Sequence, residues 1–341
     1  MKIVLHIGMN KTGTSSLQFA CSRNQKVLAE AGILYPEFGQ EYSAHHGIAF
    51  GIHRHTTKKK RQNDRWAQLG DDWINKLEHE ASDYDVVLLS SEAFHHLGDP
   101  SEVARAFSGH DVKIVVYLRE HFSYIRSWYQ QNVQDGVETC LFRDFPGIRK
   151  AAQCTVLDAW VESFGINNVI PKIFDKSQLI SGDIVEDFFS SAALPTVNTK
   201  LFADAVGGKN PSVSGNLLFF RRQTNQLLTR EQATSVSDEV GAMTVLDASF
   251  RGPIGVEEDL ACQVRDRYKE DRRLLHDKYG LCFDGLPWDP HGFRCPDMDR
   301  IHSDWELFIN EMRRTEKKML HLLTDRSPDL DVLLQSIQSS V

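Results

Sequence analysis

The sequence contains few cysteines, and none of them belongs to a paired motif. Six cysteines are scattered along 341 residues, and no two of them form a C-x-x-C arrangement. A disulfide framework or a zinc site would need paired or clustered cysteines, so we expect reduced thiols. His291 and Cys295 could be imagined as metal ligands, but they have no second pair of ligands nearby, and the sequence predicts no metal site.

Long apolar runs, internal repeats and low-complexity tracts are also absent. No apolar run approaches the ~18 residues that a membrane-spanning helix needs, so we expect no membrane span. Because an apolar strand begins almost at Met1, we expect no signal peptide and a cytoplasmic location. The net charge of −8 argues against a general affinity for nucleic acid.

The apolar residues that are present, 41% of the chain, are enough for a sizeable core. Their pattern alternates between short buried strands and helices in the first part of the chain and then becomes mostly helical, which is typical of an α/β fold with parallel strands. The expected strands are 3–7, 33–36, 86–89, 113–118 and 169–174. The expected helices are 14–31, 64–81, 121–134, 156–164, 183–190, 257–279 and 301–323. We expect an α/β core over 1–202 and a helical cap over 203–341, within one domain.

The stretch from Val4 to Gln18, VLHIGMNKTGTSSLQ, contains the first chemical signal. A buried strand ends at Gly8, a tight segment runs to Gly13, and a helix then begins with hydroxyl side chains. The amides of such a loop and the free N–H groups of the helix start converge on one point, where the helix dipole adds positive potential. This arrangement predicts an anion-binding loop, although a glycine loop after a strand can also be only a turn.

The loop departs from the nucleoside triphosphatase motif G-x-x-x-x-G-K-[ST], because Thr14 occupies the lysine position. The nearby lysine is Lys11, inside the loop. A lysine followed by T-G-T-S resembles the 5′-phosphosulfate loop of sulfotransferases, commonly P-K-[ST]-G-T-T. Asn10 replaces the proline and Ser15 replaces the second threonine, and both changes keep the amides and hydroxyls that the loop needs.

A second stretch, V-V-Y-L-R-E-H-F-S-Y-I-R-S-W-Y, resembles the sulfotransferase signature in which an arginine and a serine hold the 3′-phosphate of the donor. Arg119 follows a buried strand, and Ser127 comes eight residues later on a helix. The guanidinium offers a planar fork for a phosphate. Taken alone, Arg119 could equally form a structural ion pair. Glu120 and His121 replace the D-P that often follows the arginine.

Glu92 follows the strand 86–89, at the edge of a parallel sheet where chemistry is usually found. A carboxylate there can take a proton from a hydroxyl substrate. Two alternatives are a helix-start carboxylate and the magnesium-linked acid of a P-loop enzyme. His45 and His46 are rival candidates for the base.

Together the two signatures resemble a sulfotransferase that uses 3′-phosphoadenosine 5′-phosphosulfate (PAPS) and releases adenosine 3′,5′-bisphosphate (PAP). The resemblance implies a P-loop-like three-layer α/β fold with a central parallel sheet. It implies an acceptor hydroxyl or amine on a carbohydrate or small metabolite, since bacterial carbohydrate-type members are the most similar. The alternatives are a degenerate P-loop kinase and a non-catalytic nucleotide-binding protein. The expected catalytic residues are Lys11 and Glu92, and the expected donor ligands are Lys11, Thr12, Gly13, Thr14, Ser15, Ser16, Arg119 and Ser127.

Two basic segments have no assigned role. His53 to Arg61 could be a surface loop that meets an anionic acceptor, or an ordinary solvated loop. Lys209 could belong to a late loop that closes over the donor, or to an ordinary connection.

Overall fold

The computed structural model describes residues 1–57, 70, 72–96, 99–191, 194–202, 212–326, 332 and 335. Lys58 to Arg61 and Lys209 lie outside these residues, so the predictions for them stay predictions. The described chain divides into two compact units, which are taken one at a time below. The boundary predicted at residue 202 also stays a prediction.

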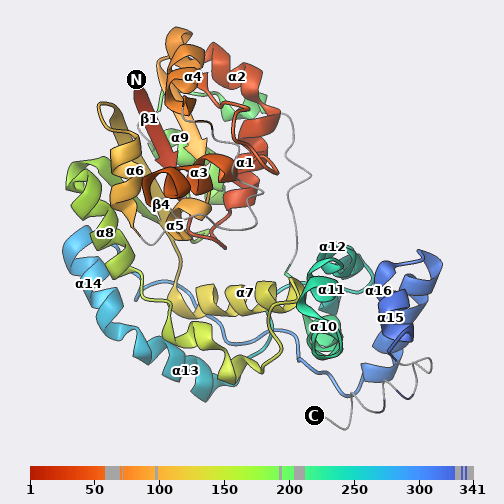
Figure 1. The fold of residues 1–341 in the computed structure, drawn as a ribbon. Helices are drawn as coiled ribbons and strands as arrows, with labels where there is room; N and C mark the ends of the chain where they lie inside the picture. The colour runs from red at the N-terminus through yellow and green to blue at the C-terminus, as the bar shows by residue number, and fades with distance from the viewer. Residues whose placement is uncertain are drawn as a thin grey trace. The chain divides into compact units, whose positions relative to one another are not determined.

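Unit 1 comprises Met1–Glu120, Ala152–Lys209 and Lys269–Leu286, and its centre is a parallel sheet, of which Figure 1 labels β1 and β4. The strand order is β2-β3-β1-β4-β5. This confirms the predicted α/β fold with a central parallel sheet. The strands are β1 (Lys2–His6), β2 (Ile33–Leu34), β3 (Val86–Ser90), β4 (Asp111–Leu118) and β5 (Val169–Ile173). β5 is an edge strand of the sheet, a position that tolerates its internal Pro171.

Helices cover both faces of this sheet, because residues of both alternating sets on β1, such as Val4 and Leu5, are fully buried. On one face Val4 belongs to a core cluster with Leu17 of α1 and Phe188 of α9. Four further helices form a row in which α3 contacts α6, α6 contacts α8 and α8 contacts α14. The helices of unit 1 are α1 (Thr14–Arg23), α2 (Gln25–Glu30), α3 (His46–Thr57), α4 (Trp73–Glu80), α5 (Ala93–His96), α6 (Pro100–Ala106), α8 (Cys154–Phe164), α9 (Ile184–Ser191) and α14 (Lys269–Tyr279). Its 3-10 helices are η1 (Ala81–Asp83), η4 (Ile166–Asn168), η5 (Ile180–Gly182) and η6 (Thr199–Leu201).

Two sequence predictions in unit 1 need correction. The helix expected over 14–31 is interrupted at Asn24, whose side chain donates to the carbonyl of Ala20 instead of continuing the helix. The sequence after residue 45 is polar and predicts an irregular segment, but α3 occupies 46–57. Ile48 and Ile52 stand one helical turn apart and are fully buried, which explains the helix.

Unit 2 comprises His121–Ala151, Asn210–Tyr268 and Pro287–Val341, and its described part is mostly helical. Its helix α10 contacts both α7 and α15, and α7 also contacts α12 and α13. The segment 287–296 is irregular, and Arg126 of α7 holds it through hydrogen bonds to the carbonyls of Asp289 (2.8 Å) and His291 (3.2 Å). The helices of unit 2 are α7 (His121–Gln134), α10 (Gly215–Leu227), α11 (Arg230–Thr234), α12 (Ser237–Ala242), α13 (Glu258–Arg267), α15 (Ile301–Arg314) and α16 (Lys318–Thr324). Its 3-10 helices are η2 (Phe142–Asp144), η3 (Pro146–Arg149), η7 (Met243–Val245) and η8 (Ala248–Phe250). Among the described residues, no helix is long and apolar enough to cross a membrane.

Two buried histidines connect the strands at the carboxyl edge of the sheet. His6, the last residue of β1, hydrogen-bonds through Nδ1 with the Ser90 hydroxyl at 2.8 Å. His45 accepts the Ser90 backbone N–H at Nδ1 (3.1 Å), so its proton is on Nε2, which donates to the carbonyl of Pro36 (2.9 Å). Both rings are fully buried, and burial lowers the pKa of each histidine to about 4.

These histidines predict a loss of stability in mild acid. The unfolded chain takes up a proton on each histidine below a pKa of about 6.5, whereas the folded chain stays neutral down to about 4, so stability decreases as the pH falls through this window. Between pH 7 and pH 5 we expect a loss of about 2 kcal/mol for each histidine, measured by urea unfolding. The side-chain amide of His45→Gln can still donate to the carbonyl of Pro36. In this variant the loss of unfolding free energy between pH 7 and pH 5 should be smaller by the contribution of one histidine. His291→Gln, at an exposed position, should leave it unchanged. If the unfolding free energy of His45→Gln depended on pH as strongly as that of the wild-type chain, the lowered pKa of His45 would be contradicted.

Candidate functional site

The loop between β1 and α1 is held against β4 by backbone hydrogen bonds that continue beyond the end of β1. The N–H of Met9 donates to the carbonyl of Tyr117 at 3.0 Å, and the N–H of Tyr117 donates to the carbonyl of Gly8 at 2.8 Å. The loop therefore begins at a fixed position on the carboxyl edge of the sheet, where the chain must turn sharply before α1.

Glycine is required at both ends of this loop. Gly8 has a φ of 99° and Gly13 has a φ of 77°, values that side chains rarely tolerate. A Cβ on Gly13 would come within 2.8 Å of the Phe174 ring, and one on Gly8 would come within 3.1 Å of the Cβ of Glu92. The loop thus approaches the first turn after β3 closely, which brings Glu92 next to it.

The hydroxyl residues of the loop and of α1 differ in what their side chains can do. Thr12 is fully buried, and its hydroxyl donates to the carbonyl of Met9 at 2.5 Å. Any contribution of Thr12 to anion binding would therefore come through its backbone. Thr14 is also buried, whereas Ser15 is exposed and Ser16 is partly exposed. The N-cap residue of α1 is Gly13, which has no side chain to cap the helix, and the first turn of α1 contains no acidic residue.

The carboxylate of Glu92 has defined partners. Its Oε2 accepts a hydrogen bond from Gln18 Nε2 of α1 at 2.9 Å, and its Oε1 lies 3.9 Å from Nε2 of His46. The side chain of Glu92 is 25% exposed and that of His46 is 19% exposed, so both can meet a ligand. His46 Nδ1 hydrogen-bonds with the hydroxyl of Ser91 at 2.7 Å, and this hydroxyl also accepts the N–H of Ala93 at the start of α5.

Arg119 follows β4 and reaches the loop. Its Nη1 donates to the carbonyl of Lys11 at 3.1 Å, and its guanidinium lies 5.9 Å from the centre of the Phe174 ring. Gln153 Nε2 in turn donates to the backbone carbonyl of Arg119 at 2.7 Å. Lys11 itself has a φ of 63°, an uncommon conformation for a residue with a side chain.

Unit 1 therefore brings together most of the residues that the sequence singled out. Lys11, Glu92 and Arg119 meet at the carboxyl edge of the sheet, with His46 beside Glu92 and the hydroxyls of α1 at the end of the loop. Ser127 lies on α7 of unit 2 and is buried, so its role as a donor ligand stays a prediction.

Sequence reasoning missed three residues that shape this edge. Gln18 stands four residues after Thr14, one helical turn further along α1, so helical spacing could have found it. Phe174 follows β5 directly, at the same edge as the other strand ends. No local pattern in the sequence points to Gln153, whose contact with Arg119 depends on the tertiary fold.

Comparison with known proteins yields one weak structural likeness. No family model matches the chain, and no curated protein matches it. A crystal structure of a sulfotransferase from Alicyclobacillus acidocaldarius superposes with a TM-score of 0.41 and 17% sequence identity, covering 66% of this chain and 90% of that one. A TM-score this low does not establish a shared fold, so the functional argument rests on the residues of the chain itself.

Proposed function

We propose that the chain is a sulfotransferase that uses PAPS as the donor and a hydroxyl or amine of a carbohydrate or small metabolite as the acceptor. The observation that carries the proposal is the hydrogen bond from Arg119 to the carbonyl of Lys11. It brings the arginine of the second signature to the loop of the first, the loop that leads into α1.

The residues at this place fit an anionic donor. Lys11 and Arg119 supply cationic side chains, Ser15 and Ser16 supply hydroxyls that are at least partly exposed, and the first turn of α1 has no carboxylate to compete with a bound anion. Gly13 lets the loop turn beside the Phe174 ring. The donor supplies an activated sulfuryl group, and the protein has to hold it, neutralise the charge that develops and remove a proton from the acceptor.

Lys11 and the start of α1 would perform the electrostatic part of this work. Negative charge develops on the leaving phosphate during transfer, and a fixed cation and oriented N–H groups stabilise it without reorganising. Arg119, held by its own carbonyl and by its contact with the loop, would bind a phosphate through its planar guanidinium fork. A 3′-phosphate would distinguish PAPS from ATP.

Glu92 would act as the general base. Its carboxylate is directed to Gln18 and His46, whereas the hydroxyl of Ser91 accepts the first N–H of α5. This argues against the role of a helix-start carboxylate. His45 uses both ring nitrogens inside the core, which leaves His46 as the rival base.

The first prediction concerns the choice of donor. We expect PAP to bind unit 1 much more tightly than 5′-AMP, and we expect Arg119→Ala to remove most of this difference. Loss of one charge-assisted phosphate contact should cost about 1.5–3 kcal/mol, which is about 10–150-fold in affinity. Calorimetric titration measures both nucleotides. Arg105→Ala, an exposed arginine on α6, is the matched control.

The same titration tests the alternatives. Equal affinity of the wild-type chain for PAP and 5′-AMP would refute the donor assignment, and preference for ATP with magnesium would favour the kinase. Equal weakening of both nucleotides in Arg119→Ala would mean that Arg119 only shapes the loop.

The second prediction concerns Lys11. Lys11→Ala keeps the backbone carbonyl that Arg119 contacts, so the loop should retain its form. We expect turnover to fall by about 10²–10³ while the affinity for PAP changes much less, because the cation is needed most as charge develops. Release of PAP from PAPS with a panel of mono- and disaccharides measures turnover. Lys26→Ala, exposed on α2, is the control. A change in donor affinity alone would make Lys11 only a binding residue.

The third prediction concerns the base. Glu92→Gln can still accept the hydrogen bond from Gln18 but cannot take a proton, so we expect turnover to fall by about 10²–10⁴ with PAP affinity nearly unchanged. His46→Ala should cost much less, and Glu30→Gln, at an exposed position of α2, should cost nothing measurable. Near-normal turnover in Glu92→Gln together with a collapse in His46→Ala would transfer the role to the histidine.

A further inference from the structure

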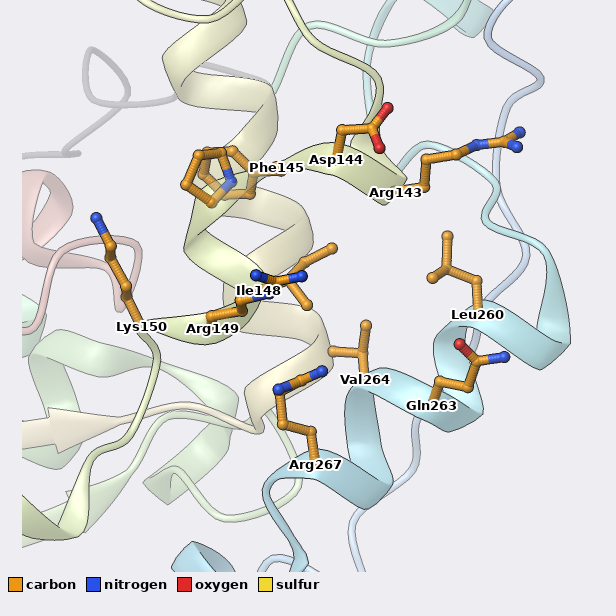
Figure 2. A pocket seen from close by; sticks show the side chains of 11 residues that line it. Arg143, Asp144, Phe145, Ile148, Arg149, Lys150, Leu260, Gln263, Val264 and Arg267 are labelled. Atoms are coloured by element: carbon orange, nitrogen blue, oxygen red, sulfur yellow. The ribbon is translucent and has the colours of Figure 1, made fainter.

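Unit 2 contains a cavity of about 480 Å³ between η3 and α13 (Figure 2). Four cationic side chains line it, those of Arg143, Arg149, Lys150 and Arg267, together with the single carboxylate of Asp144. Such a concentration of positive charge is unexpected in a chain whose net charge is −8.

The local fold explains why the basic side chains of one wall face outward. Phe142 of η2, Phe145 between the two 3-10 helices and Ile148 of η3 are all buried. Phe142 and Phe145 pack edge-on against Tyr129, and Phe145 also packs against Trp128. The apolar residues thus fix this wall to α7, and the charged residues between them remain exposed.

The second wall is joined to the first by one tyrosine. The hydroxyl of Tyr268 donates to the carbonyl of Ile148 at 2.6 Å and accepts the N–H of Ala151 at 2.9 Å. These bonds bracket the two basic residues at 149 and 150 and hold them beside the end of α13, where Arg267 precedes the tyrosine. The cationic groups are therefore gathered by a buried tertiary contact rather than by chance proximity of surface loops.

The cations of this cavity lack strong partners in the described part of the chain. Arg149, Lys150 and Arg267 are exposed and form no ion pair or side-chain hydrogen bond with another described residue. Arg143 lies 4.0 Å from Glu257, and both side chains are largely exposed, so this pair contributes little. Like charges held together in this way repel one another, and a bound anion would relieve that repulsion.

A deeper arginine extends the same surface. A second cavity of about 150 Å³ shares Arg143 and Leu260 with the first, and Arg222 lines it. Arg222 is only 7% exposed, its guanidinium hydrogen-bonds with the side chain of Tyr129, and it lies 5.6 Å from the centre of the Phe219 ring. Its Nε has no hydrogen-bond partner among the described residues, and none of these neighbours is a carboxylate. A buried guanidinium without a counter-charge is costly, so a bound anion would stabilise it.

We propose that these two cavities form one binding site for an organic ligand that carries several sulfate or phosphate groups on a ring scaffold. The guanidinium groups on the two walls suit such a ligand, because each guanidinium can form a pair of hydrogen bonds to one sulfate or phosphate group. Pro146 and Leu260, which also line the first cavity and are at least partly exposed, offer apolar surface to the carbon face of a ring. The volume lies within the range of about 300–1,000 Å³ that small-molecule sites occupy. All of the lining residues belong to unit 2, so the inference does not depend on the function proposed for unit 1.

The test uses the full chain and two rigid polyanions, sucrose octasulfate and myo-inositol hexakisphosphate, titrated by calorimetry at constant ionic strength. We expect at least one of them to bind, and we expect neutral sucrose not to bind. The variant Arg149→Gln/Arg267→Gln removes one guanidinium from each wall at exposed positions. It should weaken the polyanion by about 10–100-fold or more, because two charge-assisted contacts are lost. Arg222→Gln should weaken it as well.

A control variant that removes the same charge elsewhere distinguishes binding in the cavities from a general attraction of the polyanion to positive charge on the protein. Arg230→Gln/Arg313→Gln removes the same charge from exposed positions elsewhere in unit 2 and should leave binding unchanged. Equal weakening in both double variants would overturn the proposal, as would full competition by inorganic sulfate at the same sulfate concentration. PAP is titrated in parallel. Loss of PAP binding in Arg149→Gln/Arg267→Gln would assign these arginines to the nucleotide and would also overturn the proposal. If PAP fails to bind the wild-type chain while the polyanion binds, the function proposed for unit 1 fails and this site stands.

Discussion

The hydrogen bonds by which β4 continues to hold the chain after β1 has ended are the constraint on which the candidate site depends. Because Gly8 and Met9 both pair with Tyr117, the chain reaches the carboxyl edge in a fixed position. The loop must then turn within a few residues, which requires left-handed glycines and places Lys11 where Arg119 can reach its carbonyl. The backbone hydrogen bonds that extend the pairing of β1 with β4 past the end of β1 therefore determine where Lys11 and Arg119 meet.

The same edge shows that residue type alone does not separate structural from chemical roles. His45 and His46 are neighbours in the sequence. Both ring nitrogens of His45 form hydrogen bonds inside the core, whereas His46 faces Glu92 and its ring is partly exposed. Thr12 and Ser15 differ in the same way, since one hydroxyl closes the loop and the other is exposed. A polar group is available for chemistry only where the fold leaves it accessible to a ligand.

The parts of the structure that could be predicted are those whose signals are local. Buried strands are continuous apolar runs, and the loop carries its glycines and lysine within a few residues, so both were visible in the sequence. The helix over 46–57 was missed because its polar residues hide the buried pair Ile48 and Ile52. The cavity of unit 2 could not be predicted, because Arg149 and Arg267 stand far apart in the sequence and meet only through the hydroxyl of Tyr268.

Net charge describes how a whole chain behaves toward a long polyanion, and it says little about one cavity. At physiological ionic strength, exposed charges more than about 8 Å apart are largely screened from one another. The acidic residues that make the chain negative overall therefore do not cancel a group of arginines gathered on two adjoining walls. Unit 1 offers an anion a loop, a helix start and an arginine fixed by the backbone, whereas unit 2 offers side-chain cations over apolar surface. The first arrangement suits a compact terminal group whose charge changes during a reaction, and the second suits a larger ligand whose charges stay constant.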